Sequence, residues 1–115
     1  MTDLEDIRET LSVLETWEQR YQYLIELGDQ LPEMSPEACT DQNLIRGCQS
    51  LVWLAVDFDV VSNRVLLCMQ SDAAIVRGLI SIVLSAYNAK SPGEILAFDI
   101  EALFADLELL AHVTL

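Results

Sequence analysis

Apolar residues recur every three or four positions near the start of the chain, which predicts two helices. The segment Thr2–Glu5 has the spacing of a capping box, so we expect Thr2 to open the first helix. Its apolar face is Leu4, Ile7, Leu11 and Leu14. The same spacing at Thr16–Gln19 predicts a second helix over Trp17–Asp29, with Gly28 and Pro32 ending it. One long, kinked helix is the alternative.

The residues expected on the inner face of the second helix are Tyr21, Leu24, Ile25 and Leu27. The following segment, Leu31–Asn43, holds two prolines and Cys39 and is expected to be a loop.

Continuous apolar runs in the middle of the chain predict strands. Leu51–Val56 is apolar on both faces, so this strand needs cover on both sides or keeps one face for a partner. Asp57–Asn63 is rich in turn formers, and Arg64–Gln70 has the pattern of a second strand. The two strands are expected to pair as an antiparallel hairpin. Cys68, inside the second strand, is interpreted as an inert core thiol.

Three further helices are predicted after the hairpin. Ala73–Asn88 is apolar almost all round, which indicates a central buried helix, and Ser71 or Asp72 is expected to cap it. Ser91–Glu94 combines an N-cap serine, a proline and a capping-box glutamate, so a short helix begins there. Asp99 is expected to cap the last helix.

Helices, then a hairpin, then helices indicate an α+β fold with a small antiparallel sheet packed on helices. The sheet is the hairpin, with a third strand as an open alternative. A length of 115 residues fits a single domain spanning residues 1–115.

The chain is strongly acidic, with a net charge of −13. Binding to nucleic acid or to an anionic membrane surface is therefore not expected, because both need clustered cations. The charge serves solubility or favours a partner with a basic patch. Ala73–Tyr87, the longest apolar region, is shorter than the ~20 residues that a membrane span needs. The acidic N-terminus lacks a signal-peptide core, so we expect a cytoplasmic protein with reduced thiols.

Several kinds of site lack the residues they require. The chain has three cysteines, no Cys-x-x-Cys motif and one histidine, His112, which is too little for a metal cluster. A nucleophile–histidine pair would have to use His112, which no local motif supports, and His112 is expected to be a surface residue. Glycine is too scarce for a phosphate-binding loop. Lys90 is the only lysine and lies in a predicted turn, so a pyridoxal Schiff base on this chain is not expected.

Cys48 remains as the candidate for chemistry. It follows Gly47, which permits a sharp turn that projects the thiol, and it precedes an apolar run. A small buried hydrophobe at a strand start is the alternative for an arbitrary cysteine. Sulfur transfer needs only one accessible thiolate, with no base and no cofactor of its own. Arg46 is the nearest cation in sequence and could favour the thiolate.

Three stretches carry a resemblance to a known family: WEQRYQYLIELGDQLP, NLIRGCQSLVWL and SDAAIVRGLISIVLSAYNAKSPGEIL. In these stretches the chain resembles the SufE-type sulfur acceptors, including CsdE-like proteins, which work with group II cysteine desulfurases in iron–sulfur cluster biogenesis. The Gly-Cys-Gln-Ser turn matches the acceptor site of that family. The resemblance implies an α+β fold shared with IscU-type scaffold proteins.

The resemblance also implies a role for each matched residue. Cys48 would receive sulfur from the persulfide of the desulfurase, stimulate that enzyme and pass sulfur to a cluster scaffold. The pyridoxal phosphate would belong to the desulfurase. Asp72 matches an acidic residue at the start of the central helix and is expected to position the acceptor loop. The other residues expected to position the loop or contact the partner are Asn43, Ile45, Arg46, Gly47, Gln49 and Ser50.

Members of that family usually continue past the equivalent of His112 with a Pro-Ser-Arg segment and another helix. This sequence ends at Leu115, so we expect either exposed apolar surface beside the acceptor loop or a mobile loop. This leaves open a second function: an acidic binding module that regulates a desulfurase without carrying sulfur. A thiol peroxidase or redox sensor is a third, less favoured alternative, because neither a resolving cysteine nor a base is evident.

Overall fold

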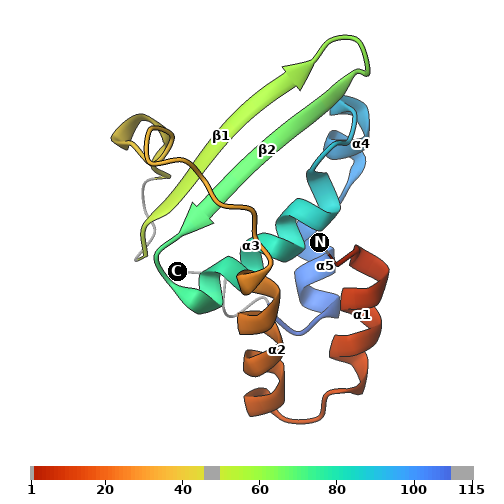
Figure 1. Ribbon diagram of the computed structural model, residues 1–115. Helices are drawn as coiled ribbons and strands as arrows, with labels where there is room; N and C mark the ends of the chain where they lie inside the picture. The colour runs from red at the N-terminus through yellow and green to blue at the C-terminus, as the bar shows by residue number, and fades with distance from the viewer. Residues whose placement is uncertain (1, 46–49, 110–115) are drawn as a thin grey trace.

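The computed structural model describes residues 2–45 and 50–109. The helices lie to one side of one long β-hairpin (Figure 1). The elements, in chain order, are α1 (Leu4–Val13), α2 (Trp17–Asp29), the 3-10 turn η1 (Asp41–Asn43), β1 (Val52–Asp59), β2 (Arg64–Ser71), α3 (Ala74–Tyr87), α4 (Pro92–Ala97) and α5 (Ile100–Asp106). The predicted α+β class is confirmed.

Most helix boundaries follow the predicted caps. Thr16 and Gln19 form the expected capping box, and so do Ser91 and Glu94. Asp99 accepts a hydrogen bond from the Ala102 amide and caps α5. The first cap was predicted wrongly: Asp3, one residue after Thr2, accepts the hydrogen bond from the Asp6 amide.

Thr2 bonds elsewhere: its hydroxyl donates to the Gln30 side chain at 2.9 Å. Tyr21 was also misplaced. It was expected on the inner face of α2, but its side chain is exposed.

The hairpin is longer than predicted. Asp57, Phe58 and Asp59 continue β1 and pair with Leu66, Val65 and Arg64, so the turn covers only residues 60–63. The pairs of β1 and β2 run from Val52↔Ser71 to Asp59↔Arg64. Among the described residues the sheet has these two strands, and in place of a third strand there are two isolated bridges, Leu44↔Trp53 on the β1 edge and Val65↔Lys90 on the β2 edge.

Two cores hold the domain together. The larger one lies among the helices and is built on Ile7, Leu11, Leu24, Ile82, Leu103, Phe104 and neighbouring apolar residues. The smaller one joins one face of the hairpin to α3: Val52, Leu67 and Met69 pack with Ile80 and Leu84. The prediction that the central helix is buried against the sheet is therefore confirmed.

Helices α2 and α3 approach each other closely at two glycines. A Cβ on Gly28 would lie 2.8 Å from the Gly78 nitrogen, and a Cβ on Gly78 would overlap the carbonyl oxygen of Leu24. Gly28 is therefore a packing residue inside α2, and its predicted role in ending that helix is wrong. Ser81 strengthens the crossing by donating to the carbonyl of Leu27 at 3.0 Å. Because the sheet packs on α3, this crossing also fixes the hairpin relative to α2.

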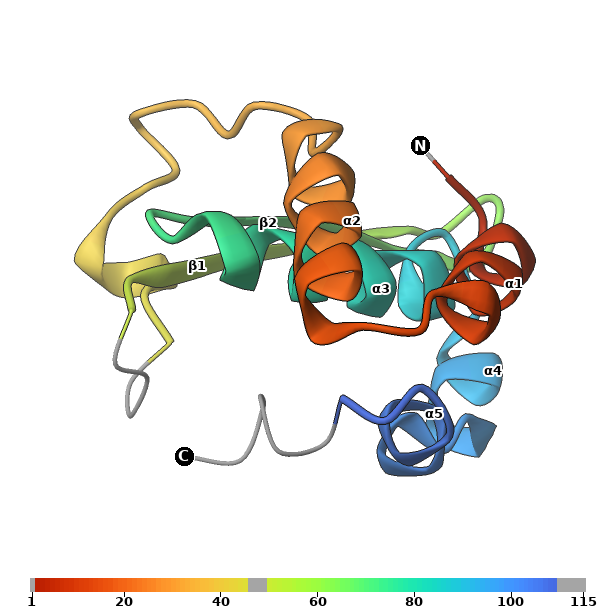
Figure 2. The same cartoon turned by 90° about the horizontal axis from the view of Figure 1, so that it is seen from below.

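The first residues of β1 lie at the opposite end of the molecule from α1 and α4 (Figures 1 and 2). The loop that precedes β1 is therefore held by the sheet and the N-terminal end of α3. No helix among the described residues is long and apolar enough to span a membrane.

Candidate functional site

The candidate loop is closed at its base by backbone pairing. The amide of Ile45 donates to the carbonyl of Val52 at 2.8 Å, and Leu44 forms an antiparallel bridge with Trp53. These contacts pair the chain segments that precede and follow residues 46–51, and the two segments run in opposite directions. Ile45 and Val52 also pack in the smaller core, so the base of the loop is fixed by apolar contacts as well.

Asp72 provides a second attachment, on the C-terminal side of the loop. Its carboxylate accepts a hydrogen bond from the Leu51 amide at 3.0 Å, and its own amide donates to the Leu51 carbonyl at 3.3 Å. The end of the loop is thereby held beside the start of α3. Sequence reasoning singled out Asp72 but missed its partner, because a backbone group carries no signal in the sequence.

The prediction that Ser71 or Asp72 caps α3 through its side chain is wrong. The N-cap residue is Ala73, which makes no side-chain capping bond. The Ser71 hydroxyl instead accepts from the Ala73 amide at 3.2 Å, while the Asp72 carboxylate is engaged with Leu51. The tight turn from β2 into α3 therefore leaves Asp72 free to hold the loop.

Asn43 shapes the segment that leads into the loop. Its side-chain amide donates to the carbonyl of Ala38 at 2.7 Å, which holds η1 against the preceding turn. Ser50, at the other end, is half-buried. The predicted residues Arg46, Gly47, Cys48 and Gln49 lie outside the described residues, and the predicted surface His112 does as well. The structure thus brings Ile45 and Asp72 to the two sides of the loop.

The other two cysteines occupy separate places. Cys39 is half-buried, and its Sγ lies 4.0 Å from the carbonyl oxygen of Met34. Cys68 pairs with Ala55 across the hairpin. Cys68 was expected in the core, but it is only half-buried and belongs to neither core cluster. The described residues include no group of three or more His, Cys, Asp or Glu side chains placed to bind a metal ion.

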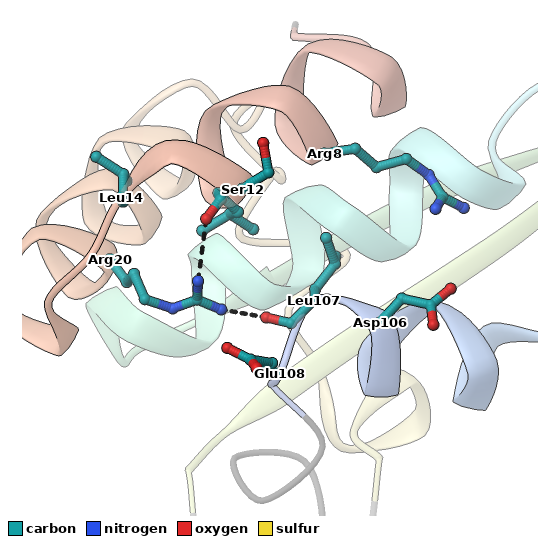
Figure 3. A pocket seen from close by; sticks show the side chains of 8 residues that line it. Arg8, Ser12, Leu14, Arg20, Asp106, Leu107 and Glu108 are labelled. Atoms are coloured by element: carbon teal, nitrogen blue, oxygen red, sulfur yellow. Dashed lines mark hydrogen bonds between the residues drawn. The ribbon is translucent and has the colours of Figure 1, made fainter.

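A pocket elsewhere in the molecule has a structural explanation. It is a cavity of about 270 Å³ between α1, α2 and the end of α5, and it contains the buried Arg20 (Figure 3). The guanidinium donates to the carbonyl of Leu11 at 3.0 Å and to the carbonyl of Leu107. It also lies over the Trp17 ring, 4.9 Å from the centroid. Arg20 therefore ties three chain segments together, a role that its position in an amphipathic helix did not predict.

Comparisons with known proteins agree with this architecture. The family model described as "SufE: Fe-S metabolism associated domain" matches residues 5–115. An uncharacterized SufE-like protein of Rhizobium meliloti (strain 1021) is 40% identical over 116 residues, which cover 99% of this chain and 83% of that protein.

The solution structure of a hypothetical protein from Thermus thermophilus shares the fold, with a TM-score of 0.62 and 21% identity. The match covers 96% of this chain and 92% of that one. At this low identity the likeness supports the fold alone. The family match and the Rhizobium relative each span almost the whole chain, and the chain belongs to the SufE family of Fe–S metabolism associated domains.

Proposed function

We propose that this protein accepts sulfur on Cys48 from the cysteine persulfide of a group II cysteine desulfurase, stimulates that enzyme, and passes the sulfur to an iron–sulfur cluster scaffold. Membership of a family associated with Fe–S metabolism supports the metabolic role. The observation that carries the proposal is the attachment of the Gly-Cys-Gln-Ser loop on both sides, through Ile45–Val52 and Leu51–Asp72.

The proposed transfer needs one thiolate and an incoming persulfide. The Cys48 thiolate attacks the outer sulfur of the donor persulfide, and a new sulfur–sulfur bond forms on Cys48. The sulfur–sulfur bond of the donor breaks, and the donor cysteine leaves as a thiolate. The protein gains one sulfur atom as a persulfide, and no external oxidant or reductant is consumed. A second thiolate exchange of the same kind delivers the sulfur to the scaffold.

The attachment of the loop at both ends supports the proposal that one short segment serves both the desulfurase and the scaffold. Entry into a desulfurase requires that Cys48 be presented in a narrow range of positions, because thiolate exchange depends on access to the sulfur atom. The bonds from Ile45 and to Asp72 restrict where the two ends of the loop can move. Pyridoxal phosphate would belong to the desulfurase, and this chain would supply only the acceptor thiol.

The test is a mass measurement of the intact protein after incubation with cysteine and a group II desulfurase. The wild type is expected to gain one sulfur atom that a thiol reductant removes. Cys48→Ser is expected to gain none, while Cys68→Ser, a matched substitution on β2, keeps the gain. Sulfur that persists in Cys48→Ser would refute the proposal. A wild type that stimulates the desulfurase without gaining sulfur would favour the regulatory binding module.

A further inference from the structure

The two outer edges of the hairpin differ in how they are covered. On the β2 edge, the Val65 amide donates to the Lys90 carbonyl at 2.8 Å, and the Ala89 amide donates to the Val65 carbonyl at 2.9 Å. The Leu67 amide on the same edge donates to the Asn88 side chain at 2.8 Å. The segment that follows α3 therefore satisfies both outward backbone groups of Val65 and the outward amide of Leu67.

Within residues 2–45 and 50–109, the β1 edge is covered only at its beginning. The Val52 carbonyl accepts from Ile45, so Val52 and every second residue after it direct their backbone groups outward. Those residues are Leu54, Val56 and Phe58. Among the described residues, the last bridge on this edge is at Trp53, and Figure 1 shows β1 as the outer border of the sheet beyond η1. The Phe58 amide is satisfied locally, by the Asp57 carboxylate at 2.8 Å.

The uncovered part of β1 is also apolar. Val56 is 61% exposed and Phe58 is 44% exposed, and they point to the same face of the strand. In the turn that follows, the side chains of Val60 and Val61 are 79% and 97% exposed. Native proteins normally shorten, charge or cover such an edge, because exposed apolar edge strands pair with other chains. We call the segment from Val56 to Val61 the open edge.

Charge indicates what kind of chain this edge can accept. Asp57 and Asp59 are exposed on the opposite face of β1 from Val56 and Phe58, and the chain as a whole carries −13. An added strand would place its own alternating side chains beside these two rows. We propose that the open edge binds, by strand addition, an extended segment of a partner protein in which apolar residues alternate with lysine or arginine.

A second copy of this chain is a poorer match for the open edge. Antiparallel pairing of two β1 strands about Val56 would bring both Asp57 side chains onto one face as diagonal neighbours, and like charges there are unfavourable. Each copy would also bring its net charge of −13. The proposal is independent of sulfur transfer, since the open edge lies at the turn end of the hairpin, away from the start of β1 where Ile45 pairs with Val52.

The probe is a fluorescent peptide of alternating lysine and valine, added to the full-length protein. Fluorescence anisotropy reports binding, and amide NMR reports the place. We expect saturable binding with shifts centred on the amide of Val56. Two control peptides are expected not to bind: one with glutamate in place of lysine, and one with N-methyl groups on the amides that would pair.

Variants of β1 distinguish backbone pairing at the open edge from non-specific binding of the peptide. Val56→Pro removes one outward amide of the open edge, and an edge strand tolerates proline there. It should weaken peptide binding by about tenfold, as expected for lost backbone pairing. Val56→Thr keeps the amide and a β-branched side chain, so it should bind like the wild type. Asp57→Lys reverses one charge beside the open edge and should weaken binding, although it also releases the Phe58 amide from the Asp57 carboxylate.

The proposal is overturned if the glutamate peptide binds as well as the lysine peptide, or if the NMR shifts lie away from β1. It is also overturned if the wild type sediments as a dimer that Val56→Pro converts to a monomer, because the open edge then binds a second copy. Circular dichroism of each variant confirms that the fold is intact before binding is compared.

Discussion

Asp72 and Leu51 exchange two hydrogen bonds across the junction between the loop and α3. The carboxylate accepts from the Leu51 amide at 3.0 Å, and the Asp72 amide donates to the Leu51 carbonyl at 3.3 Å. Leu51 lies three residues after Cys48 in sequence, so the pair controls the position of the end of the candidate loop. Only one of the two bonds depends on the Asp72 side chain, which makes its contribution separable by substitution.

Asp72→Ala should slow sulfur acceptance by Cys48 while lowering the free energy of unfolding only slightly. It removes one exposed hydrogen bond, for which we expect a loss of about 0.5–1.5 kcal/mol in the free energy of unfolding. Asp72→Asn retains an acceptor oxygen and should lie between Ala and the wild type. Urea unfolding gives the stability, and the rate of sulfur gain by mass gives the transfer. Equal transfer rates in all three proteins would show that this bond does not position the loop.

Gly78→Ala should destabilise the domain, because the added methyl group overlaps the Leu24 carbonyl oxygen at the α2–α3 crossing. Overpacking of this kind costs about 1–3 kcal/mol or more. Gly93→Ala is the matched control: nothing lies within 4 Å of its Cβ, and Gly93 lies in α4. That control should be neutral or more stable by about 0.4–1 kcal/mol. Urea unfolding measures both, and a neutral Gly78→Ala would contradict the close crossing.

Arg20→Lys should lower the melting temperature, although it preserves the charge. A single ammonium cannot reach the two carbonyls that the guanidinium joins, at Leu11 and Leu107. Leaving a buried carbonyl unpaired costs about 1–3 kcal/mol. Arg8→Lys is the control, because the 4.0 Å ion pair of Arg8 with Glu5 is exposed and the substitution should change stability by less than about 1 kcal/mol. Equal melting temperatures for the two variants would show that the hydrogen bonds from Arg20 to the Leu11 and Leu107 carbonyls do not stabilise the domain.

The hairpin turn should open locally in acid. Hydrogen bonds from the Ser62 side chain, and then from the Ser62 and Val61 amides, hold the pKa of Asp59 below its usual range. A carboxyl group with a lowered folded-state pKa stabilises the turn at pH values above its unfolded pKa. That stabilisation is lost as the pH falls through the folded value.

Amide NMR of Val61 and Ser62 during an acid titration measures this opening. The change in both amides should follow the Asp59 carboxyl signal. In Asp59→Asn the same amides should lose this pH dependence. If the two amides of that variant still change with pH, another group causes the effect.

Local signals in the sequence located most of the helices. The Thr16–Gln19 and Ser91–Glu94 boxes are satisfied by residues within one turn, so the sequence alone identifies them. The end of β1 was missed because Asp57 and Asp59 are typical turn formers. They lie at an exposed edge, where strand pairing with Leu66 and Arg64 requires no burial.

The site was predictable in its residues and less so in its contacts. Asp72 and Ile45 were expected near the loop, but their partners are backbone groups of Leu51 and Val52. Such partners follow from strand register and from the turn into α3, which no local motif encodes. Gly28 was misread for a similar reason, because its role depends on Gly78, fifty residues later in the chain.

The most direct test of the central claim uses the double variant Cys39→Ser/Cys68→Ser, in which Cys48 is the only thiol. The variant is incubated with cysteine and a group II desulfurase and analysed by intact and peptide mass spectrometry. We expect the gain of one reducible sulfur atom, located on the peptide that contains Cys48. A variant that gains no sulfur, beside a wild type that carries it on Cys39 or Cys68, would contradict the account.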